Sequence, residues 1–413
     1  MIALTSLLLA LTLALLPTVL SQAAIGSETQ EAPVPAAIVT PAQALERLFT
    51  AETVESDWFA PSFLQQVPLD QIQSLLATIG GQLGPLRQVD AHGEGFALTF
   101  ERGAAQAQIS LDGQGRIASL LLSPADPPLS LEEAAERIAA FPGEASLLVL
   151  GDGRVLAAVN PEQPLAVGSA FKLAVLAALR QAIAQGEMAW DDVVTLEDNQ
   201  ISLPSGLLQT WPVGSHLTLE TLATLMIAVS DNTATDALIH ILGQEAIAPF
   251  APNNVPLLTT RAFFALKNPV NGDLLAQYRQ GDAATRETLL FTLADAPLPP
   301  TSLFTGEPVA LDVEWFFSTQ DLCGLMDQVA GLPLMGVNPG VASPSDWQAI
   351  AFKGGSEPGV LNLTTQVQHV DGRTYCVAAT WNDATQPLDE AALTRFYGSV
   401  LAGLVHRENP AVP

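Results

Sequence analysis

Three short motifs in this chain combine side chains that can carry out acyl transfer, and the first is Ser169-Ala170-Phe171-Lys172. A helical pattern of apolar residues follows over 173–184. Residues three apart lie on one face of a helix, so Lys172 can reach the Ser169 hydroxyl. A serine hydroxyl is a weak nucleophile until a nearby base removes its proton, and a lysine becomes such a base when burial or a neighbouring cation lowers its pKa. The motif predicts an acylable serine; the alternative is a serine that caps a helix beside a solvated lysine.

The second motif, Ser230-Asp231-Asn232, follows a strongly periodic helical stretch that Thr218 can cap. On a tight turn, a hydroxyl and an amide two residues apart project together into a cleft. Ser230 would then pass a proton to a leaving group, and Asn232 would hold a substrate amide. Taken alone, the tripeptide is explained as well by an ordinary polar end of a helix.

The third motif, Lys353-Gly354-Gly355-Ser356, follows the apolar run 349–352, which predicts a strand edge. Glycines there would let a substrate backbone approach the strand. Lys353 would bind a carboxylate and lower the pKa of nearby groups, and the Ser356 N–H would be an oxyanion donor beside that of Ser169. The alternative is a glycine bulge beside a surface lysine. The chain has only three lysines, the other being Lys267, so two in such motifs are informative.

In this order the motifs resemble those of class A β-lactamases and penicillin-binding serine enzymes. The stretch 217–235 is also similar to class A, and the likeness covers about 145–405. It implies that Ser169 is the acyl-accepting nucleophile and Lys172 its base. It also implies that Ser230 and Asn232 line the cleft, while Lys353, Gly354, Gly355 and Ser356 bind the substrate. The implied activity is hydrolysis of β-lactams or of small esters and amides.

One departure from the family concerns deacylation, which class A enzymes perform with a glutamate in a Glu-x-x-Leu-Asn motif. The corresponding stretch here, 261–271, contains no acid. No spacing argument selects among the later acids Asp273, Asp282 and Glu287. Two alternatives to a hydrolase therefore stay open: a non-catalytic or slowly acylating protein that binds penicillin or cell-wall peptide, and a D,D-peptidase.

The layout also resembles two-domain β-lactamase-like proteins of clavulanic acid biosynthesis, which carry an isomerase-like N-terminal domain. Residues 167–173 and 353–360 carry this likeness. It implies weak or absent β-lactam hydrolysis and an esterase-like activity.

Composition and motif content limit the kinds of partner that this protein can bind. The net charge of −27 disfavours nucleic acid and an anionic membrane surface. The five histidines lie in no context typical of a Ser-His-Asp hydrolase, and no metal-binding or phosphate-loop motif occurs in the sequence, so no metal or other cofactor is implied. The expected partner is a small-molecule substrate, and the oligomeric state stays open.

The N-terminal part divides into three predicted segments. An uncharged apolar run ending in small residues predicts a signal peptide over 1–23, with an uncleaved anchor as the alternative, so we expect an exported protein. Residues 24–39 predict a linker. Residues 40–124 predict a small α+β domain that resembles the cone of nuclear transport factor 2 and ketosteroid isomerase. We expect it to dock or space rather than bind a ligand. Its predicted elements are helices 41–50 and 70–79, a strand over 86–100, and a hairpin of 107–111 with 116–122.

Residues 130–413 predict the serine hydrolase domain, of α+β class with an αβα layering. Ser130 and Glu133 form a capping box, strands are expected over 145–150 and 154–159, and a last helix over 388–406. An antiparallel sheet covered by the two terminal helices follows from this order. Cys323 lies in a helical pattern and Cys376 in a strand-like run; we expect two free thiols rather than a disulfide.

Overall fold

The structure, a computed structural model, describes residues 39–92, 95–101, 103–125, 128–405 and 407. The chain divides into two compact units between Asp126 and Pro127. The predicted signal peptide, and the predicted linker except for its last residue, lie outside the described residues. Within the described ranges, no helix is long and apolar enough to cross a membrane.

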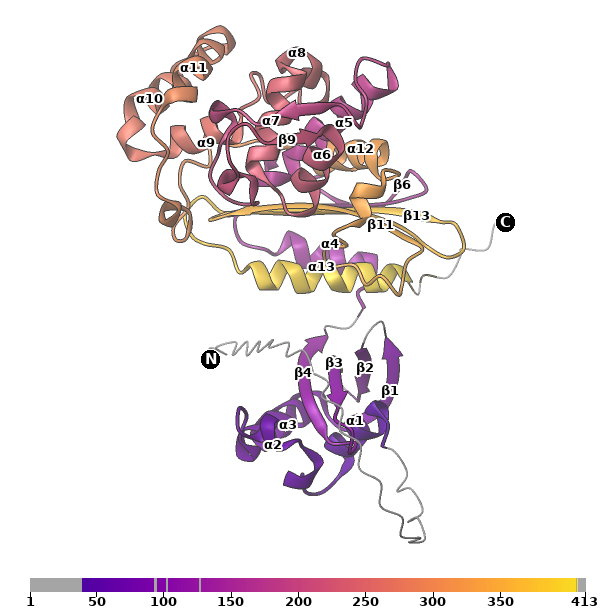
Figure 1. The fold of residues 1–413 in the computed structure, drawn as a ribbon. Coiled ribbons are helices and arrows are strands. Elements are labelled where there is room, and N and C mark those ends of the chain that lie inside the picture. The colour runs from indigo at the N-terminus through magenta and orange to yellow at the C-terminus, as the bar shows by residue number, and fades with distance from the viewer. Residues whose placement is uncertain (1–38, 93–94, 102, 126–127, 406, 408–413) are drawn as a thin grey trace, which may run out of the picture. The chain divides into compact units, whose positions relative to one another are not determined.

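Unit 1 is a four-stranded antiparallel sheet in the order β1-β2-β3-β4, packed against helices (Figure 1). A capping box of Thr40 and Gln43 begins α1, and its fully buried Leu45 belongs to the same core as Leu98 and Ile117. The elements are α1 (Pro41–Thr50), η1 (Ser56–Trp58), α2 (Pro61–Leu64), α3 (Leu69–Leu83), β1 (Leu86–His92), β2 (Gly95–Phe100), β3 (Gly103–Leu111) and β4 (Ile117–Ala125).

The single strand predicted over 86–100 is wrong, because the chain reverses in the middle and forms the hairpin of β1 and β2. His92 pairs with Gly95, and Val89 pairs with Leu98. Alternation of apolar residues continues through both arms of a tight hairpin, so the pattern alone does not reveal the turn. A strand of that length also exceeds the usual span across a small core.

Unit 2 is built on a five-stranded antiparallel sheet in the order β11-β12-β13-β5-β6. Helices α4 and α13 cover one face, and a larger group of helices covers the other, which confirms the predicted αβα layering (Figure 1). The strands are β5 (Glu144–Gly151), β6 (Arg154–Val159), β11 (Ala349–Glu357), β12 (Val360–Gln368) and β13 (Thr374–Asn382). The capping box of Ser130 and Glu133 at the start of α4 is confirmed. β11 lies at the edge of the sheet, as its motif predicts.

The remaining elements of unit 2 lie mostly between β6 and β11 in the sequence. The helices are α4 (Leu131–Ala139), α5 (Lys172–Ala184), α6 (Leu219–Ala228), α7 (Asn232–Leu242), α8 (Gln244–Ile247), α9 (Thr260–Lys267), α10 (Gly272–Gln280), α11 (Ala283–Asp295), α12 (Thr319–Val329) and α13 (Glu390–Val405). Short strands pair as β7 (Leu165–Ala166) with β10 (Phe316–Phe317), and β8 (Val193–Thr195) with β9 (His216–Thr218). The 3-10 turns η2 (Gly168–Phe171) and η7 (Thr301–Phe304) matter for the site.

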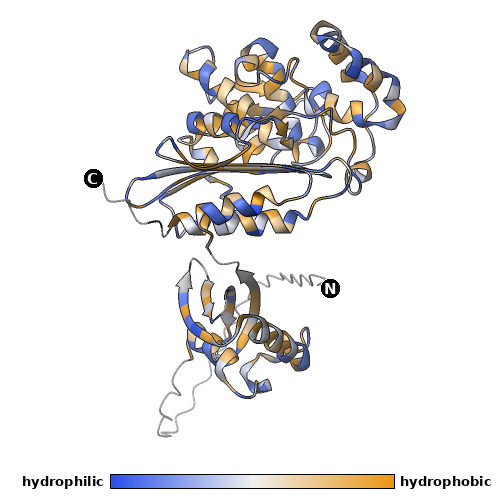
Figure 2. Ribbon diagram, turned by 180° about the vertical axis from the view of Figure 1, so that it is seen from behind, coloured by the Kyte–Doolittle hydropathy of each residue, from blue (hydrophilic) through white to orange (hydrophobic). Residues whose placement is uncertain are grey.

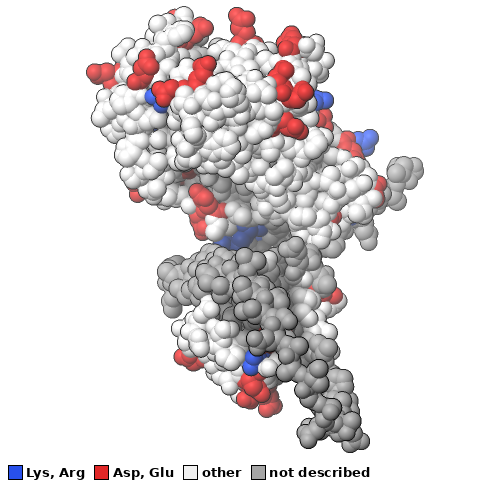
Figure 3. Space-filling view, viewed as in Figure 1, with Lys and Arg blue, Asp and Glu red and all other residues white. Residues whose placement is uncertain are grey.

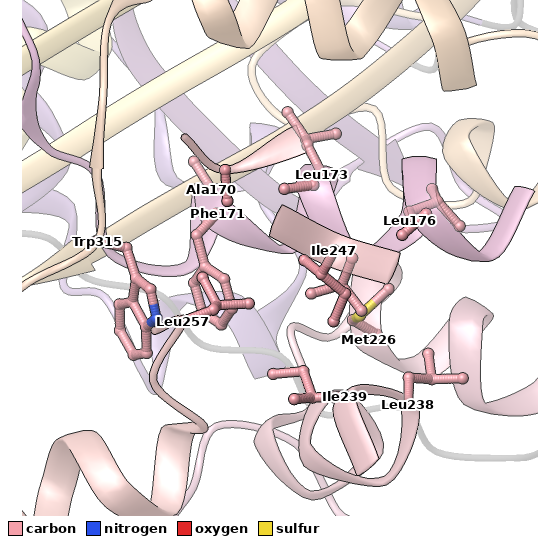
Figure 4. Packing of buried hydrophobic residues seen from close by; sticks show 14 of the residues in the cluster. Ala170, Phe171, Leu173, Leu176, Met226, Leu238, Ile239, Ile247, Leu257 and Trp315 are labelled. Atoms are coloured by element: carbon pink, nitrogen blue, oxygen red, sulfur yellow. The ribbon is translucent and has the colours of Figure 1, made fainter. Parts of the chain in front are cut away.

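Two apolar cores hold these layers together. Between the sheet and the larger helical layer, α5 is buried over most of its length among α6, α7 and α12. Figure 4 shows Phe171 and Leu173 of this core near Trp315, Ile247 and Met226. On the other face, α13 buries a stripe at helical spacing, and Figure 2 shows hydrophilic and hydrophobic residues mixed along this long helix, as expected of an amphipathic helix.

The expectation of two free thiols is wrong, because Cys323 and Cys376 form a disulfide. Helix α12 packs on the sheet against β13, which brings the two Cα atoms to 5.9 Å, within the range that a disulfide spans. The two residues are 53 positions apart in the sequence. Nothing in the helical pattern around the first or the strand pattern around the second indicates that these elements lie against each other.

Candidate active site

One cleft of unit 2, with a volume of about 720 Å³, contains parts of all three motifs. Ser169 comes from η2 at the start of α5, Ser230 from the turn between α6 and α7, and Lys353 from β11. The predicted site residues that line the cleft are Ser169, Ser230, Asn232, Lys353, Gly354, Gly355 and Ser356. Lys172 is completely buried, and its ammonium group contacts two of the residues that line the cleft.

Glycine at position 355 lets β11 pass directly against η2. A Cβ on Gly355 would overlap Val167 O and Ser169 N, and it would lie 2.7 Å from Ala170 N. Gly168, at φ +49°, faces Ser356 N in the same contact. The glycine that we expected to make room for a substrate backbone therefore also makes room for the turn that carries Ser169.

The Lys172 ammonium lies within a set of oxygen acceptors. Its Nζ donates to Ser230 O at 2.7 Å, to Ser230 Oγ at 3.1 Å and to Asn232 Oδ1 at 2.6 Å. Burial lowers the pKa of Lys172 well below its usual value, and the charge of Lys353 lowers it further. The alternative of a solvated lysine is therefore wrong, and a buried lysine of lowered pKa is suited to act as a base.

Lys353 is also buried, at 3% exposure, so it is not a surface lysine. Its Nζ donates to Ser230 Oγ at 3.1 Å and to Gly354 O at 2.5 Å, and burial lowers its pKa to about 7. The Ser230 hydroxyl thus bridges the two lysines. Ser230 has φ +54°, a left-handed conformation that costs a non-glycine residue about 1–3 kcal/mol and persists only where the surroundings enforce it.

Asp231, which sequence reasoning did not select, holds this turn in place. Its Oδ1 accepts from Ala234 N and caps α7, while Oδ2 accepts from Leu207 N and Leu208 N. The Asn232 amide donates to Leu203 O at 3.0 Å and accepts from Lys172. Both ends of the Asn232 side chain therefore contact the protein, while the residue also lines the cleft, where its expected role is to hold a substrate amide.

Aromatic side chains also line the cleft, and sequence reasoning missed them. Phe263 stacks on Trp315 with ring centroids 4.2 Å apart, and Phe264 meets Phe304 of η7 edge-on at 5.0 Å. These residues come from α9 and from the segment after α11, which carried no recognisable motif. The cleft thus offers the Lys353 ammonium group together with aromatic side chains that can contact a hydrophobic substituent.

The acid-free stretch 261–271 contributes a lysine instead of a glutamate. Lys267, at the end of α9, forms ion pairs with Glu314, at 2.5 Å, and with Glu357 of β11. Lys267 and Glu314 are inaccessible to solvent, and the Glu357 side chain is 10% exposed where it lines the cleft. The position of Glu357, directly after Ser356, was the available signal in the sequence.

Two further observations describe the surroundings of the site. In the part of the chain that the structure describes, no three His, Cys, Asp or Glu side chains are grouped to hold a metal ion. Figure 3 shows acidic side chains scattered over one face of unit 2. On that face the charge is dispersed rather than gathered into a basic patch.

Comparison with known proteins gives one family match and several similar structures. No curated protein matches the chain. A β-lactamase from Sphaerobacter thermophilus DSM 20745 shares 20% identity at a TM-score of 0.47, over 67% of this chain and 94% of that one. A structure of PBP-A shares 18% identity at a TM-score of 0.44, over 68% of this chain and 97% of that one. A β-lactamase from Desulfarculus baarsii DSM 2075 shares 17% identity at a TM-score of 0.47, over 67% of this chain and 98% of that one. Residues 130–254, which contain the first two motifs, match the model of the β-lactamase enzyme family.

Proposed function

We propose that unit 2 is a serine acyl hydrolase of β-lactamase type, which forms an acyl-enzyme on Ser169 with β-lactams or with small esters and amides. The observation that carries the proposal is the buried Lys172, three residues after Ser169 in the sequence. Its pKa is lowered, and its ammonium group contacts the Ser230 hydroxyl. Among the described residues no carboxylate forms an ion pair with Lys172; burial lowers its pKa by more than the charges of Asp236 and Asp231 raise it, so the pKa stays low. Lys172 is useful as a base.

In the acylation step, neutral Lys172 takes the proton of Ser169, and Ser169 Oγ attacks the substrate carbonyl. The Ser230 hydroxyl, 3.1 Å from each lysine Nζ, relays a proton to the leaving group. The backbone N–H groups of Ser169 and Ser356 stabilise the negative charge on the carbonyl oxygen. The contact between η2 and β11 supports this pairing, because it brings these two backbone segments together.

The substrate class follows from two kinds of side chain that line the cleft. Lys353 provides a cation for a carboxylate, as carried by β-lactams and by peptides with a free C-terminus. Phe264, Phe304 and Trp315 provide an apolar surface for a side group. A small molecule that carries a carboxylate, an acyl carbonyl and an apolar substituent matches both kinds of side chain.

The test combines covalent labelling with turnover. Wild-type protein and the Ser169→Ala variant are incubated with a penicillin probe and analysed by intact mass, and hydrolysis of a nitrophenyl ester is followed in parallel. Wild type should give a mass adduct or ester turnover that Ser169→Ala loses, while Ser74→Ala, an exposed change in unit 1, should behave like wild type. A stable adduct without turnover would favour a binding protein or a peptidase. Absence of both from wild type would refute the proposal.

We also propose that the protein acts outside the cytoplasm. The Cys323–Cys376 disulfide is typical of oxidising compartments, and the predicted signal peptide 1–23 is consistent with this. Mass analysis of the mature protein from the secreted fraction tests it: a chain beginning after about residue 23 is expected, and a full-length chain retained in the cytoplasm would contradict it.

A further inference from the structure

We propose that Glu357 is the general base that activates water to hydrolyse the acyl group from Ser169. The inference rests on the proposed function, since it concerns the second half of the same reaction. It assigns the step for which the sequence offered no residue.

The position of Glu357 on β11 is the first argument. Side chains alternate along a strand, so Lys353, Gly355 and Glu357 share one face. Gly355, in the middle, lies against the backbone of Ser169. Lys353 and Glu357 therefore flank the nucleophile, each about 6.6 Å along the strand from Gly355. A glutamate side chain with one bound water can reach over such a distance, and a general base can act through one water.

The composition of the cleft is the second argument. Of the described residues that line it, Glu357 is the only carboxylate. Lys172 and Lys353 both contact Ser230, on the side of the site that serves the leaving group. Glu357 is 10% exposed, enough to meet a water in the cleft while remaining sheltered from bulk solvent.

The charges of the buried cluster of Lys267, Glu314 and Glu357 also support this role. Two carboxylates share one ammonium group, although a structural ion pair needs only one. Glu314 Oε2 is buried and has no hydrogen-bond partner among the described residues. Burial, together with the charge of Glu357, raises the pKa of Glu314 well above its usual value. Glu314 therefore holds its proton, so Glu357 is the carboxylate that balances the charge of Lys267 and stays available to accept a proton from water.

Deacylation consumes one water molecule and restores the enzyme. A water oxygen bonds to the acyl carbonyl carbon, and one water proton passes to Glu357. The tetrahedral intermediate collapses, the bond from that carbon to Ser169 Oγ breaks, and the proton held by Glu357 is transferred to Ser169 Oγ. The product is the free acid, which keeps the other water proton, and Ser169, Lys172 and Glu357 return to their starting states.

The experiment compares two charge-equivalent variants, Glu357→Gln and Glu314→Gln. Each leaves Lys267 with one carboxylate, so the cluster stays balanced and both should fold, which thermal melting checks. Only Glu357 lines the cleft. With a nitrophenyl ester, the initial burst of nitrophenol reports acylation and the later steady rate reports deacylation.

We expect Glu357→Gln to keep its burst and to lose its steady rate by on the order of 10²-fold or more, with an acyl adduct on Ser169 visible by intact mass. Glu314→Gln should turn over within a few fold of wild type. Turnover of Glu357→Gln at the wild-type rate, or equal loss in both variants, would overturn the inference, as would a wild-type adduct that never hydrolyses. Should either variant unfold, the double change Lys267→Met with Glu357→Gln keeps Glu314 as a neutral acid, and hydrolysis by that variant at the wild-type rate would overturn it too. A wild type that forms no adduct and shows no turnover refutes the proposed function itself. The outcomes that overturn only the role of Glu357 leave acylation of Ser169 intact.

Discussion

Replacing Gly355 with alanine tests the contact that positions the nucleophile. The added Cβ would meet backbone atoms of Val167, Ser169 and Ala170, and backbone cannot rotate away as a flexible side chain can. At 2.7 Å from Ala170 N, the methyl group must move by on the order of 1 Å to reach an ordinary contact distance. Either η2 shifts or β11 bends at its edge.

The expected magnitude has two parts. Overpacking of this kind costs about 1–3 kcal/mol of unfolding free energy, and at about 2–4 °C per kcal/mol the Tm should fall by roughly 2–12 °C. A displacement of about 1 Å between nucleophile and oxyanion donors lowers the acylation rate by on the order of 10²-fold. Activity should therefore fall much more than the folded fraction does.

The assay measures the labelling rate of Ser169 and the Tm on the same preparations. Gly324→Ala serves as the matched control, because a Cβ at this exposed position of α12 meets nothing within 4 Å. It should keep the labelling rate and gain up to about 1 kcal/mol, since alanine favours a helix over glycine. Labelling of Gly355→Ala at the wild-type rate with unchanged Tm would refute the reasoning.

Three more predictions follow from the same structure. Replacing Cys323 and Cys376 with alanine should lower the free energy of unfolding, measured by chemical denaturation, by about 4 kcal/mol, because the disulfide closes a loop with a sequence separation of 53. Reductant should have no further effect on this variant. Equal stability of oxidised and reduced wild type would contradict the prediction. Lys353, with a pKa of about 7, is charged below that pH and neutral above it. Binding of a carboxylate-bearing probe should therefore weaken as the pH rises through 7, while binding of an uncharged ester should not change. A flat pH profile for the carboxylate-bearing probe would count against Lys353 as the carboxylate-binding group. Asp231→Ala leaves three backbone N–H groups without their acceptor and should lower the unfolding free energy by about 3 kcal/mol or more; a loss below about 1 kcal/mol would show that these bonds contribute little.

Part of the architecture could be predicted because its causes are local. The capping box of Ser130 and Glu133 and the Thr218 cap of α6 act within three residues, and the structure confirms both. The predicted layering of unit 2 is confirmed as well, because the order of helices and strands at the two ends of the domain requires them to share a sheet.

Local sequence patterns do not predict the structure where one pattern fits two different structures. The alternation over 86–100 fits one long strand or two short ones equally, and only the pairing of Val89 with Leu98 distinguishes them. Cys323 and Cys376 each fit a buried apolar position, so their bond is invisible until α12 is placed on β13.

For the site, the sequence by itself determined which residue types stand in the three motifs and their order. The packing decided what those residues meet. Tertiary packing buries Lys172, places Ser230 Oγ between two lysines and brings Gly355 into contact with η2. It also joins Lys267 to Glu314 and Glu357, which lie 47 and 90 residues away. Contacts over such separations leave no periodic trace in the chain, because they depend on how whole layers pack, and pKa values that arise from burial exist only once those layers have formed.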